Sequence, residues 1–507
     1  MTDAGRPWWS HPGYAAALVL LMAVPLLWPA MPPLSDLPVH MGRYRIQAGM
    51  DGAPTLAEAF SIHWMPVGNL GVDVLVLLLG PALGIEFATK LVVLAIPMLT
   101  AAGMLFVAAE IHGRIPPTAA FALPLAYGYP FQFGFVNYAL SVALALLAFG
   151  LALRLARQKR WRARAALLLV GGIVIYFSHV MGWGVFGLLC VAEAAVRRLK
   201  EPGGVWHAAR GVAADCLPLA VPLLFILIWR GEGGGGAISA LFDLRAKWGG
   251  LESALRERWV GWDGYCALGL LGVFLVCAAR PFRLDPRLAA ALAALGVLYL
   301  CLPYAFFGLI YADARLAPLL LAIALLSLRP REGLDGRVMT LAAVAALVFF
   351  AARIAVTTVS MGLYASEQER NLEALEALPN NSRVLALVDL GCPRGWAPPR
   401  ITIASMAIVR RDSFVNDQFR MPGAQLVRVG PSIPADFAYE DSGRIRLPGC
   451  DRPEPLLADR LAAIPRDRFD HVWVLGVPRD RQPHESWLRP LWTSEQGALY
   501  RIVPPGG

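Results

Sequence analysis

Long apolar runs follow one another from about residue 13 to residue 360 and then stop. Of the 507 residues, 57% are hydrophobic and 16% are charged, whereas about a quarter of the residues in soluble domains are charged. A helix needs about 20 apolar residues to cross a bilayer. We therefore predict a polytopic α-helical membrane module at 1–361, followed by a small α/β domain at 362–507.

One of the apolar runs, 69–83, is short and contains Asp73. If it crosses the membrane, the strongly basic loops that follow it face outwards. If it lies in the interface, loops such as 155–164 and 197–210 face the cytoplasm, as the positive-inside rule requires. This rule predicts eleven transmembrane helices, an interfacial helix, a cytoplasmic N-terminus and an extracytoplasmic C-terminal domain. The runs are 13–34, 69–83, 86–109, 117–131, 134–154, 165–178, 180–196, 211–229, 261–279, 288–307, 314–328 and 337–360.

The C-terminal part alternates between strand-like and helix-like segments. Apolar, β-branched runs predict strands at 383–388, 470–477 and 498–503, with helices at 367–378 and 456–464. Cys392 and Cys450 both lie in this part, and an extracytoplasmic location would allow them to form a disulfide. The net charge of +9 comes largely from the membrane loops, so we do not expect nucleic acid as a partner.

Polar residues gather at the predicted outer ends of several spans. A pore would need polar groups along its full depth, so this one-sided distribution favours a single site at the outer face. A run of glycines at 233–236 predicts a hinged loop over 230–260 that orders on ligand binding. The polar residues are Asp36, His40, Arg43, His63, Asn69, Asp73, Gln132, Asn137, Ser178, His179, Tyr304, Tyr311, Asp313 and Arg315.

Three short stretches and the closing domain carry a family resemblance. Ser35-Asp36-Leu37-Pro38-Val39-His40 follows the first span, the helix at 69–83 leads into 84–91, and 311–318 runs into a span that contains Arg315. In this layout the chain resembles the GT-C class of integral-membrane glycosyltransferases. The resemblance implies a polyprenyl-phosphate-linked sugar donor, an unidentified glycan, lipid or protein acceptor, and a place in cell-envelope glycan synthesis at the bacterial inner membrane.

The stretch 127–138 departs from the family pattern, because many members have a second acidic residue there and this chain has none. A site with two carboxylates around a divalent metal therefore stays open, as does a non-catalytic scaffold. A transporter or lipid flippase is the other alternative. It would need polar groups at the middle of the membrane or inverted repeats.

The resemblance gives each candidate residue a role. Asp36 is expected to act as general base towards the acceptor. Arg315, Arg43 and Lys247 are expected to bind the lipid phosphate, and inversion at the anomeric carbon is implied. The remaining candidates for substrate binding are His40, His63, Asn137, His179 and Asp313.

Each candidate also has a simpler interpretation. Asp36 can cap a helix, and His40 can merely pair with Asp36. Arg43 can anchor the interface, and Arg315 can form a local ion pair with Asp313. His63 suits an aromatic belt, His179 a helix end, Asn137 a helix–helix contact and Lys247 a solvated charge.

Overall fold

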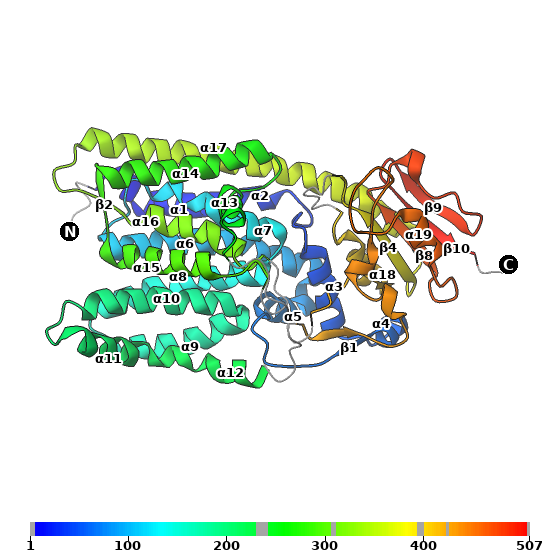
Figure 1. Cartoon of the computed structure of the whole chain (residues 1–507), viewed down its shortest axis with the longest axis horizontal. Coiled ribbons are helices and arrows are strands. Elements are labelled where there is room, and N and C mark those ends of the chain that lie inside the picture. The colour runs from blue at the N-terminus through cyan, green and yellow to red at the C-terminus, as the bar shows by residue number, and fades with distance from the viewer. Residues whose placement is uncertain (1–5, 230–241, 306–310, 393–399, 422–424, 504–507) are drawn as a thin grey trace. The chain divides into compact units, whose positions relative to one another are not determined.

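The computed structural model describes residues 6–229, 242–305, 311–392, 400–421 and 425–503. The chain divides into two compact units (Figure 1). Unit 1 comprises Met1–Trp28, Pro66–Val72 and Val92–Ser360. Unit 2 comprises Pro29–Met65, Asp73–Leu91 and Met361–Gly507, so it joins two N-terminal stretches to the C-terminal part of the chain.

Unit 1 is helical, as the apolar runs predict. Among the described residues, six helices are long and apolar enough to cross a membrane, or seven if the bent pair Gly204–Ala220 and Pro222–Ile228 forms one span. The six are α6 (Ile85–His112), α8 (Val136–Arg157), α9 (Trp161–Ser178), α10 (Val180–Arg198), α14 (Val260–Ala279) and α17 (Gly336–Leu372), whose helical course continues to Glu376. The chain is thus a polytopic membrane protein, and the count of eleven spans stays a prediction.

Shorter apolar helices account for other predicted spans. They are α1 (Pro12–Leu21) with α2 (Val24–Leu27), α11 (Gly204–Cys216) with α12 (Pro222–Trp229), α15 (Pro286–Cys301) and α16 (Ala317–Leu326). The run at 117–131 differs most from expectation. It forms η2 (Ala119–Phe121), η3 (Leu123–Tyr127) and the start of α7 (Tyr129–Phe133). Pro124 and Pro130 lack the amide hydrogens that one continuous helix would need.

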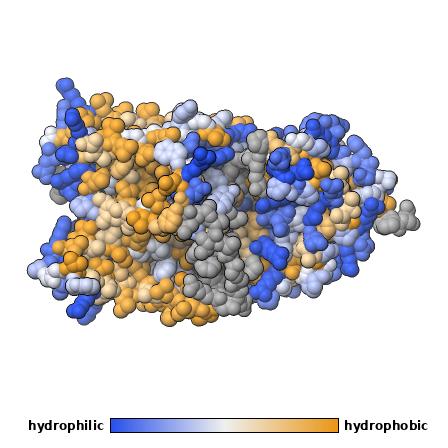
Figure 2. Space-filling view, viewed as in Figure 1, coloured by the Kyte–Doolittle hydropathy of each residue, from blue (hydrophilic) through white to orange (hydrophobic). Residues whose placement is uncertain are grey.

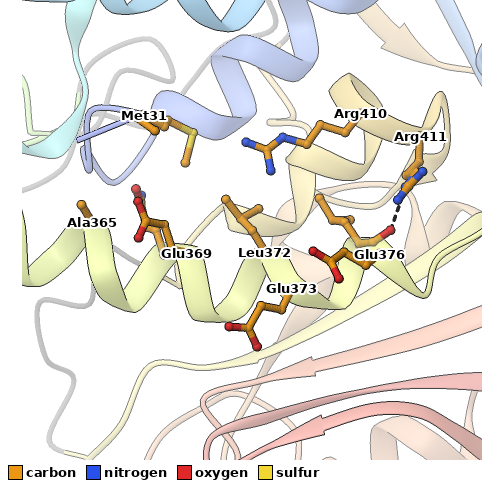
Figure 3. A pocket seen from close by; sticks show the side chains of 11 residues that line it. Met31, Ala365, Glu369, Leu372, Glu373, Glu376, Arg410 and Arg411 are labelled. Atoms are coloured by element: carbon orange, nitrogen blue, oxygen red, sulfur yellow. Dashed lines mark hydrogen bonds between the residues drawn. The ribbon is translucent and has the colours of Figure 1, made fainter. Parts of the chain in front are cut away.

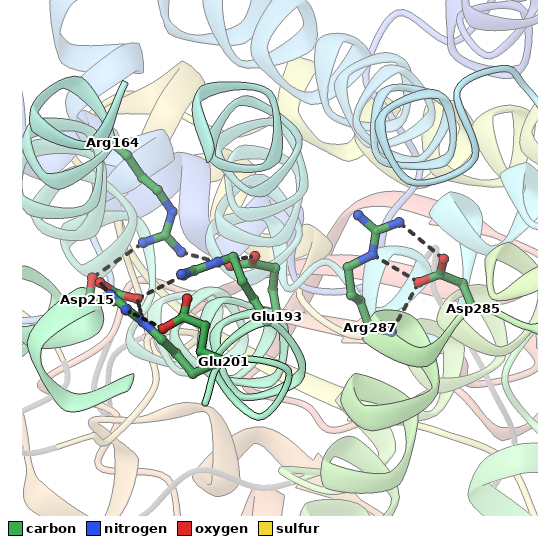
Figure 4. Close-up of polar contacts among 8 residues, drawn as sticks. Arg164, Glu193, Glu201, Asp215, Asp285 and Arg287 are labelled. Carbon is green, nitrogen blue, oxygen red and sulfur yellow. Dashed lines mark hydrogen bonds and ion pairs between the residues drawn. The ribbon is translucent and has the colours of Figure 1, made fainter. Parts of the chain in front are cut away.

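The basic loops of unit 1 gather at one end, where α8 joins α9 and α10 joins α11. Figure 2 shows hydrophilic residues at this end and hydrophobic residues along the helices. Buried acids lie beneath the loops (Figure 4): Glu193 of α10 pairs with Arg164 at 3.1 Å and with Arg197 at 3.0 Å. Asp215 of α11 pairs with Arg197 at 2.8 Å, which ties α10 to α11.

Unit 2 is built on a mixed sheet with strand order β5-β4-β8-β10-β9, and β7 also pairs with β4. The central strands confirm the sequence prediction: β4 is Arg383–Asp389, β8 is His471–Leu475 and β10 is Gly497–Ile502. Strand β4 runs parallel to β8, and β10 runs antiparallel to β8. Trp473 of β8 is fully buried in the sheet core. The other strands are β5 (Phe414–Val415), β7 (Arg444–Ile445) and β9 (Leu488–Ser494), and the predicted helix at 456–464 is α19 (Leu457–Ala462).

Within unit 2, the segment after the first apolar run packs on the C-terminal part. Helix α3 (Leu37–Gln47) lies against η7 (Ile403–Ser405) and α18 (Met406–Arg411). Gly42 permits this approach, because a Cβ there would come within 3.1 Å of Gln418 Nε2. A second link is antiparallel pairing of β1 (Phe60–Ile62), which follows α4 (Pro54–Ala59), with β6 (Val427–Val429).

Candidate functional site

Four polar residues recur along α3 at spacings of four, three and four, and we call them the α3 polar stripe: Asp36, His40, Arg43 and Gln47. Residues three and four apart share one face of a helix. Their exposed fractions are 5%, 9%, 2% and 8%, so the whole stripe is buried. Buried polar groups cost free energy unless they are paired. A row of four on a short helix therefore marks a candidate site.

Asp36 occupies the N-cap position of α3, but its side chain makes no capping hydrogen bond. The simpler interpretation as a helix cap therefore does not account for this carboxylate. The backbone oxygen of Asp36 accepts from His40 N at 3.2 Å. The His40 ring packs edge-on against Phe419, with 6.2 Å between ring centroids. The carboxylate and the imidazole thus lie one turn apart on the same buried face.

Arg43 is held by a carboxylate, Asp73, which the sequence analysis included among the outer polar residues but to which it gave no individual role. Its Nε and Nη2 donate to Asp73 Oδ1 and Oδ2 at 2.8 and 2.9 Å. Asp73 lies in the first turn of α5 (Gly71–Leu83) and is 1% exposed. A two-point pair of this kind fixes both side chains. The signal in the sequence was a charged residue inside an apolar run, which is costly in a membrane.

His63 lies apart from the stripe. It follows β1, its side chain is exposed, and its backbone N–H donates to Leu426 O at 2.8 Å. Its neighbour Trp64 is 61% exposed. This is the arrangement expected for the aromatic-belt interpretation of this pair.

In unit 1, His179 and Arg315 meet although 136 residues separate them. Arg315 Nη1 lies 3.2 Å from His179 Nε2. Arg315 lies in η5 (Ala314–Leu316), just before α16. Its guanidinium stacks on the ring of Phe135, with Cζ 3.9 Å from the ring centroid. Tyr138 of α8 donates from its hydroxyl to Arg315 O at 2.6 Å. These contacts fix the guanidinium beside the imidazole.

The side chains of His179 and Arg315 are both held in place. His179 Nδ1 accepts from Met181 N at 3.1 Å and so caps α10. Arginine has only N–H donors, and Arg315 Nη1 lies 3.2 Å from His179 Nε2, whose role as donor or acceptor depends on the imidazole tautomer. A guanidinium is suited to bind an anionic oxygen pair.

A small cavity of about 40 Å³ adjoins Arg315 within unit 1. Apart from Arg315, Tyr138 and Thr100, its walls are apolar or backbone. The apolar wall residues are Met104, Leu125, Ala126, Pro130, Phe131, Ala139, Val142, Pro318 and Leu319. The site in unit 1 therefore combines a cation with an apolar recess.

Lys247 and Asp313 form a second buried pair in unit 1. Lys247 Nζ lies 2.6 Å from Asp313 Oδ2, and the residues are 3% and 4% exposed. Lys247 lies in α13 (Leu244–Glu252) and also donates to Leu302 O. The interpretation of Lys247 as a solvated charge is therefore wrong. Asp313 pairs with Lys247. The simpler interpretation of Arg315, as the local ion-pair partner of Asp313, therefore does not account for the position of Arg315.

Asn137 joins α8 to the start of α5. Its Oδ1 accepts from Val72 N at 2.6 Å, and its Nδ2 donates to Asn69 O at 2.8 Å. Both ends of the amide are therefore engaged in holding segment 69–72. This is the helix–helix contact that was the simpler interpretation of Asn137.

Two of the sequence predictions are not tested by the described residues. The glycine run at 233–236 lies outside the described residues. Among the residues that the structure describes, no group of three or more His, Cys, Asp or Glu side chains is placed to hold a metal ion. A divalent metal thus stays an untested expectation.

Comparison with known proteins gives a fold likeness only. No family model matches the chain, and no curated protein matches it. It is similar to a crystal structure of ArnT from Cupriavidus metallidurans bound to undecaprenyl phosphate, with TM-score 0.48, 12% identity and 97% of each chain covered. The apo structure of the same protein gives TM-score 0.45 and 12% identity, covering 97% of this chain and 99% of that one. At this level the likeness carries no argument about chemistry, which has to come from the side chains.

Proposed function

We propose that this chain is a GT-C-type glycosyltransferase that moves a sugar from a polyprenyl-phosphate donor to an acceptor at the outer face of the bacterial inner membrane. The observation that carries the proposal is the buried Arg315 guanidinium, held 3.2 Å from His179 Nε2 beside an apolar recess. A lipid phosphate offers Arg315 its charged oxygens, and its hydrocarbon chain suits an apolar recess. Lys247 is paired with Asp313, so it is the weaker candidate for a phosphate ligand.

The proposed reaction forms one bond at the anomeric carbon and breaks another. The acceptor oxygen or nitrogen bonds to the anomeric carbon, and the bond from that carbon to the phosphate oxygen breaks. Asp36 removes the acceptor proton, while His179 and Arg315 stabilise the charge that remains on the polyprenyl phosphate. Attack opposite to the leaving group inverts the anomeric carbon. The N-terminus is cytoplasmic and the C-terminal domain extracytoplasmic in this proposal, which the basic loops of unit 1 support through the positive-inside rule.

Binding of undecaprenyl phosphate to the purified full-length chain tests the phosphate site, with undecaprenol as the matched ligand without phosphate. We expect the wild type to prefer the phosphate. Arg315→Ala should lose this preference, and Arg315→Lys should keep only part of it, because lysine lacks the planar fork. Arg283→Ala is the control, since Arg283 is about half exposed at the basic end of unit 1. Equal binding of both lipids by the wild type would refute the phosphate assignment.

Transport is tested in the same preparation. A transporter moves undecaprenyl-phosphate sugar across a vesicle wall without consuming it. A transferase releases undecaprenyl phosphate in proportion to acceptor modified. Accumulation of intact donor on the far side would overturn the proposal.

A further inference from the structure

A polar pocket of about 220 Å³ lies within unit 2, away from the α3 polar stripe (Figure 3). A single water needs only about 10–15 Å³, so the pocket has room for a molecular group. Its walls come from the segment that follows α2, from the end of α17 (Gly336–Leu372) with η6 (Glu373–Glu376), and from α18. The lining residues are Ala30, Met31, Ala365, Gln368, Glu369, Leu372, Glu373, Leu375, Glu376, Arg410 and Arg411.

The pocket lies where α17 changes from apolar to polar. The helix is apolar up to about Ala365, and the next turns contain Glu367, Gln368, Glu369 and Asn371. Met31 follows the end of α2 (Val24–Leu27). The α17 wall of the pocket therefore lies just beyond the end of an apolar stretch, which is where a helix that crosses a bilayer meets the lipid headgroups.

Gln368 is a buried residue in the wall of this pocket. It is 1% exposed, and neither its Nε2 nor its Oε1 has a hydrogen-bond partner among the described residues. A buried amide left unpaired costs free energy on both its donor and its acceptor side. A ligand that satisfies it must therefore bring both an N–H or O–H donor and an acceptor oxygen.

The charges around Gln368 define the ligand further. Among the described residues, no ion pair engages the carboxylates of Glu369, Glu373 or Glu376, so this wall favours a cation. On the opposite wall, Arg410 uses Nε and Nη2 on Glu86 at 2.9 and 2.7 Å. Glu86 neutralises the guanidinium, so Nη1 contributes N–H donors to an acceptor oxygen rather than a net positive charge. Figure 3 shows Glu369 and Arg410 pointing into the same space from the two sides.

We propose that this pocket binds a phosphate-linked primary amine, namely the phosphoethanolamine headgroup of a membrane lipid. The ammonium donates to Glu369 and to Gln368 Oε1. The phosphate accepts from Gln368 Nε2 and Arg410 Nη1. A choline headgroup lacks N–H donors and cannot satisfy the amide oxygen, so the pocket discriminates between the two zwitterionic lipids. This inference does not depend on the proposed transferase activity.

The test uses the full-length protein in nanodiscs of equal phosphatidylethanolamine and phosphatidylcholine content, and native mass spectrometry of the lipid retained. We expect preferential retention of phosphatidylethanolamine by the wild type and loss of this preference in Gln368→Leu and Glu369→Gln. Glu495→Gln, at an 83% exposed side chain outside the pocket, is the control and should keep it. Glu369→Gln changes an exposed residue, so it gives a result even if Gln368→Leu does not fold.

Three outcomes would overturn the proposal. The first is equal retention of both lipids by the wild type. The second is a preference that persists unchanged in Glu369→Gln and Gln368→Leu. The third is full displacement of the lipid by soluble glycerophosphoethanolamine, which would assign the pocket to a free phosphate-linked amine.

Discussion

Arg43 and Asp73 form a buried, two-point ion pair that joins α3 to α5 within unit 2. The side chains are 3% and 2% exposed. Asp73 neutralises Arg43, so Arg43 holds the α3 polar stripe in place and is a weaker candidate for binding a phosphate.

Removal of one partner of this pair should destabilise the protein strongly. Asp73→Ala leaves the buried guanidinium of Arg43 unpaired, which typically costs about 3–5 kcal/mol. We expect a clear fall in the unfolding temperature of the detergent-solubilised protein. The double variant Arg43→Met with Asp73→Leu should recover much of the loss.

The matched control for that pair is Arg479 and Glu495, whose side chains are 70% and 83% exposed. Glu495→Ala should change stability by about 0–1 kcal/mol, as for other surface pairs. If Asp73→Ala behaves like Glu495→Ala, the pair is not the structural link described here.

Cys392 and Cys450 should form a disulfide on oxidation. Both are free cysteines, and hydrogen bonding to the Cys392 side chain raises the pKa of the Cys450 thiol. Arg452 binds Asp389 at 2.8 Å and holds the two segments together. Glutathione disulfide would accept the two electrons and leave as two glutathione thiols.

Alkylation of the full-length protein, followed by mass spectrometry, checks the disulfide. After treatment with glutathione disulfide, we expect the wild type to carry the Cys392–Cys450 disulfide with no bound glutathione. In Cys392→Ser, Cys450 should be either alkylated or bound to one glutathione. Protein alkylated at cell lysis should already carry the bond if the C-terminal domain is extracytoplasmic. Full alkylation of both cysteines after oxidation would contradict the proximity, and labelling from the cytoplasmic side alone would overturn the topology.

Asp417 should make unit 2 more stable at lower pH. It is 4% exposed, and burial raises its pKa to about 7 from 3.8, although it accepts from Ser405 N at 2.9 Å. The folded state then binds the proton more tightly than the unfolded state. This contribution is full below pH 3.8 and is lost as the pH rises through about 7. The difference corresponds to roughly 4 kcal/mol.

Unfolding temperatures of the wild type and of Asp417→Asn, measured between pH 5 and pH 8, test this linkage. We expect the wild type to lose stability over this interval and the asparagine variant to lose less, because its side chain stays neutral and still accepts from Ser405. Parallel curves for the two proteins would show that Asp417 does not titrate in this range.

The parts of the fold that depend on local pattern were predictable. Continuous apolar runs indicate the helices of unit 1, and β-branched runs indicate β4, β8 and β10. The prediction of one span at 117–131 did not anticipate the break into η2, η3 and α7. Hydropathy does not register that Pro124 and Pro130 interrupt helical hydrogen bonding. The packing of α3 on α18 was also hidden, since it depends on contacts between residues more than 350 positions apart, such as Val39 and Gln418.

The candidate site was predictable only in part, for a similar reason. The spacing of Asp36 and His40 placed them on one helix face. The partners of the charged residues come from distant segments: Asp73 for Arg43, His179 for Arg315 and Asp313 for Lys247. Gln47 was overlooked although it continues the same spacing on α3, because a neutral amide attracts less notice than a charge.

The most direct test of the proposed sugar transfer, with Asp36 as general base, is the turnover of Asp36→Asn. The purified protein would be given undecaprenyl-phosphate-linked sugars and a membrane extract as acceptor, with release of undecaprenyl phosphate as the readout. We predict a loss of about 10²–10⁴-fold in turnover, as expected for removal of a general base, with unchanged binding of undecaprenyl phosphate. Turnover equal to that of the wild type would contradict the assignment of Asp36 as the base.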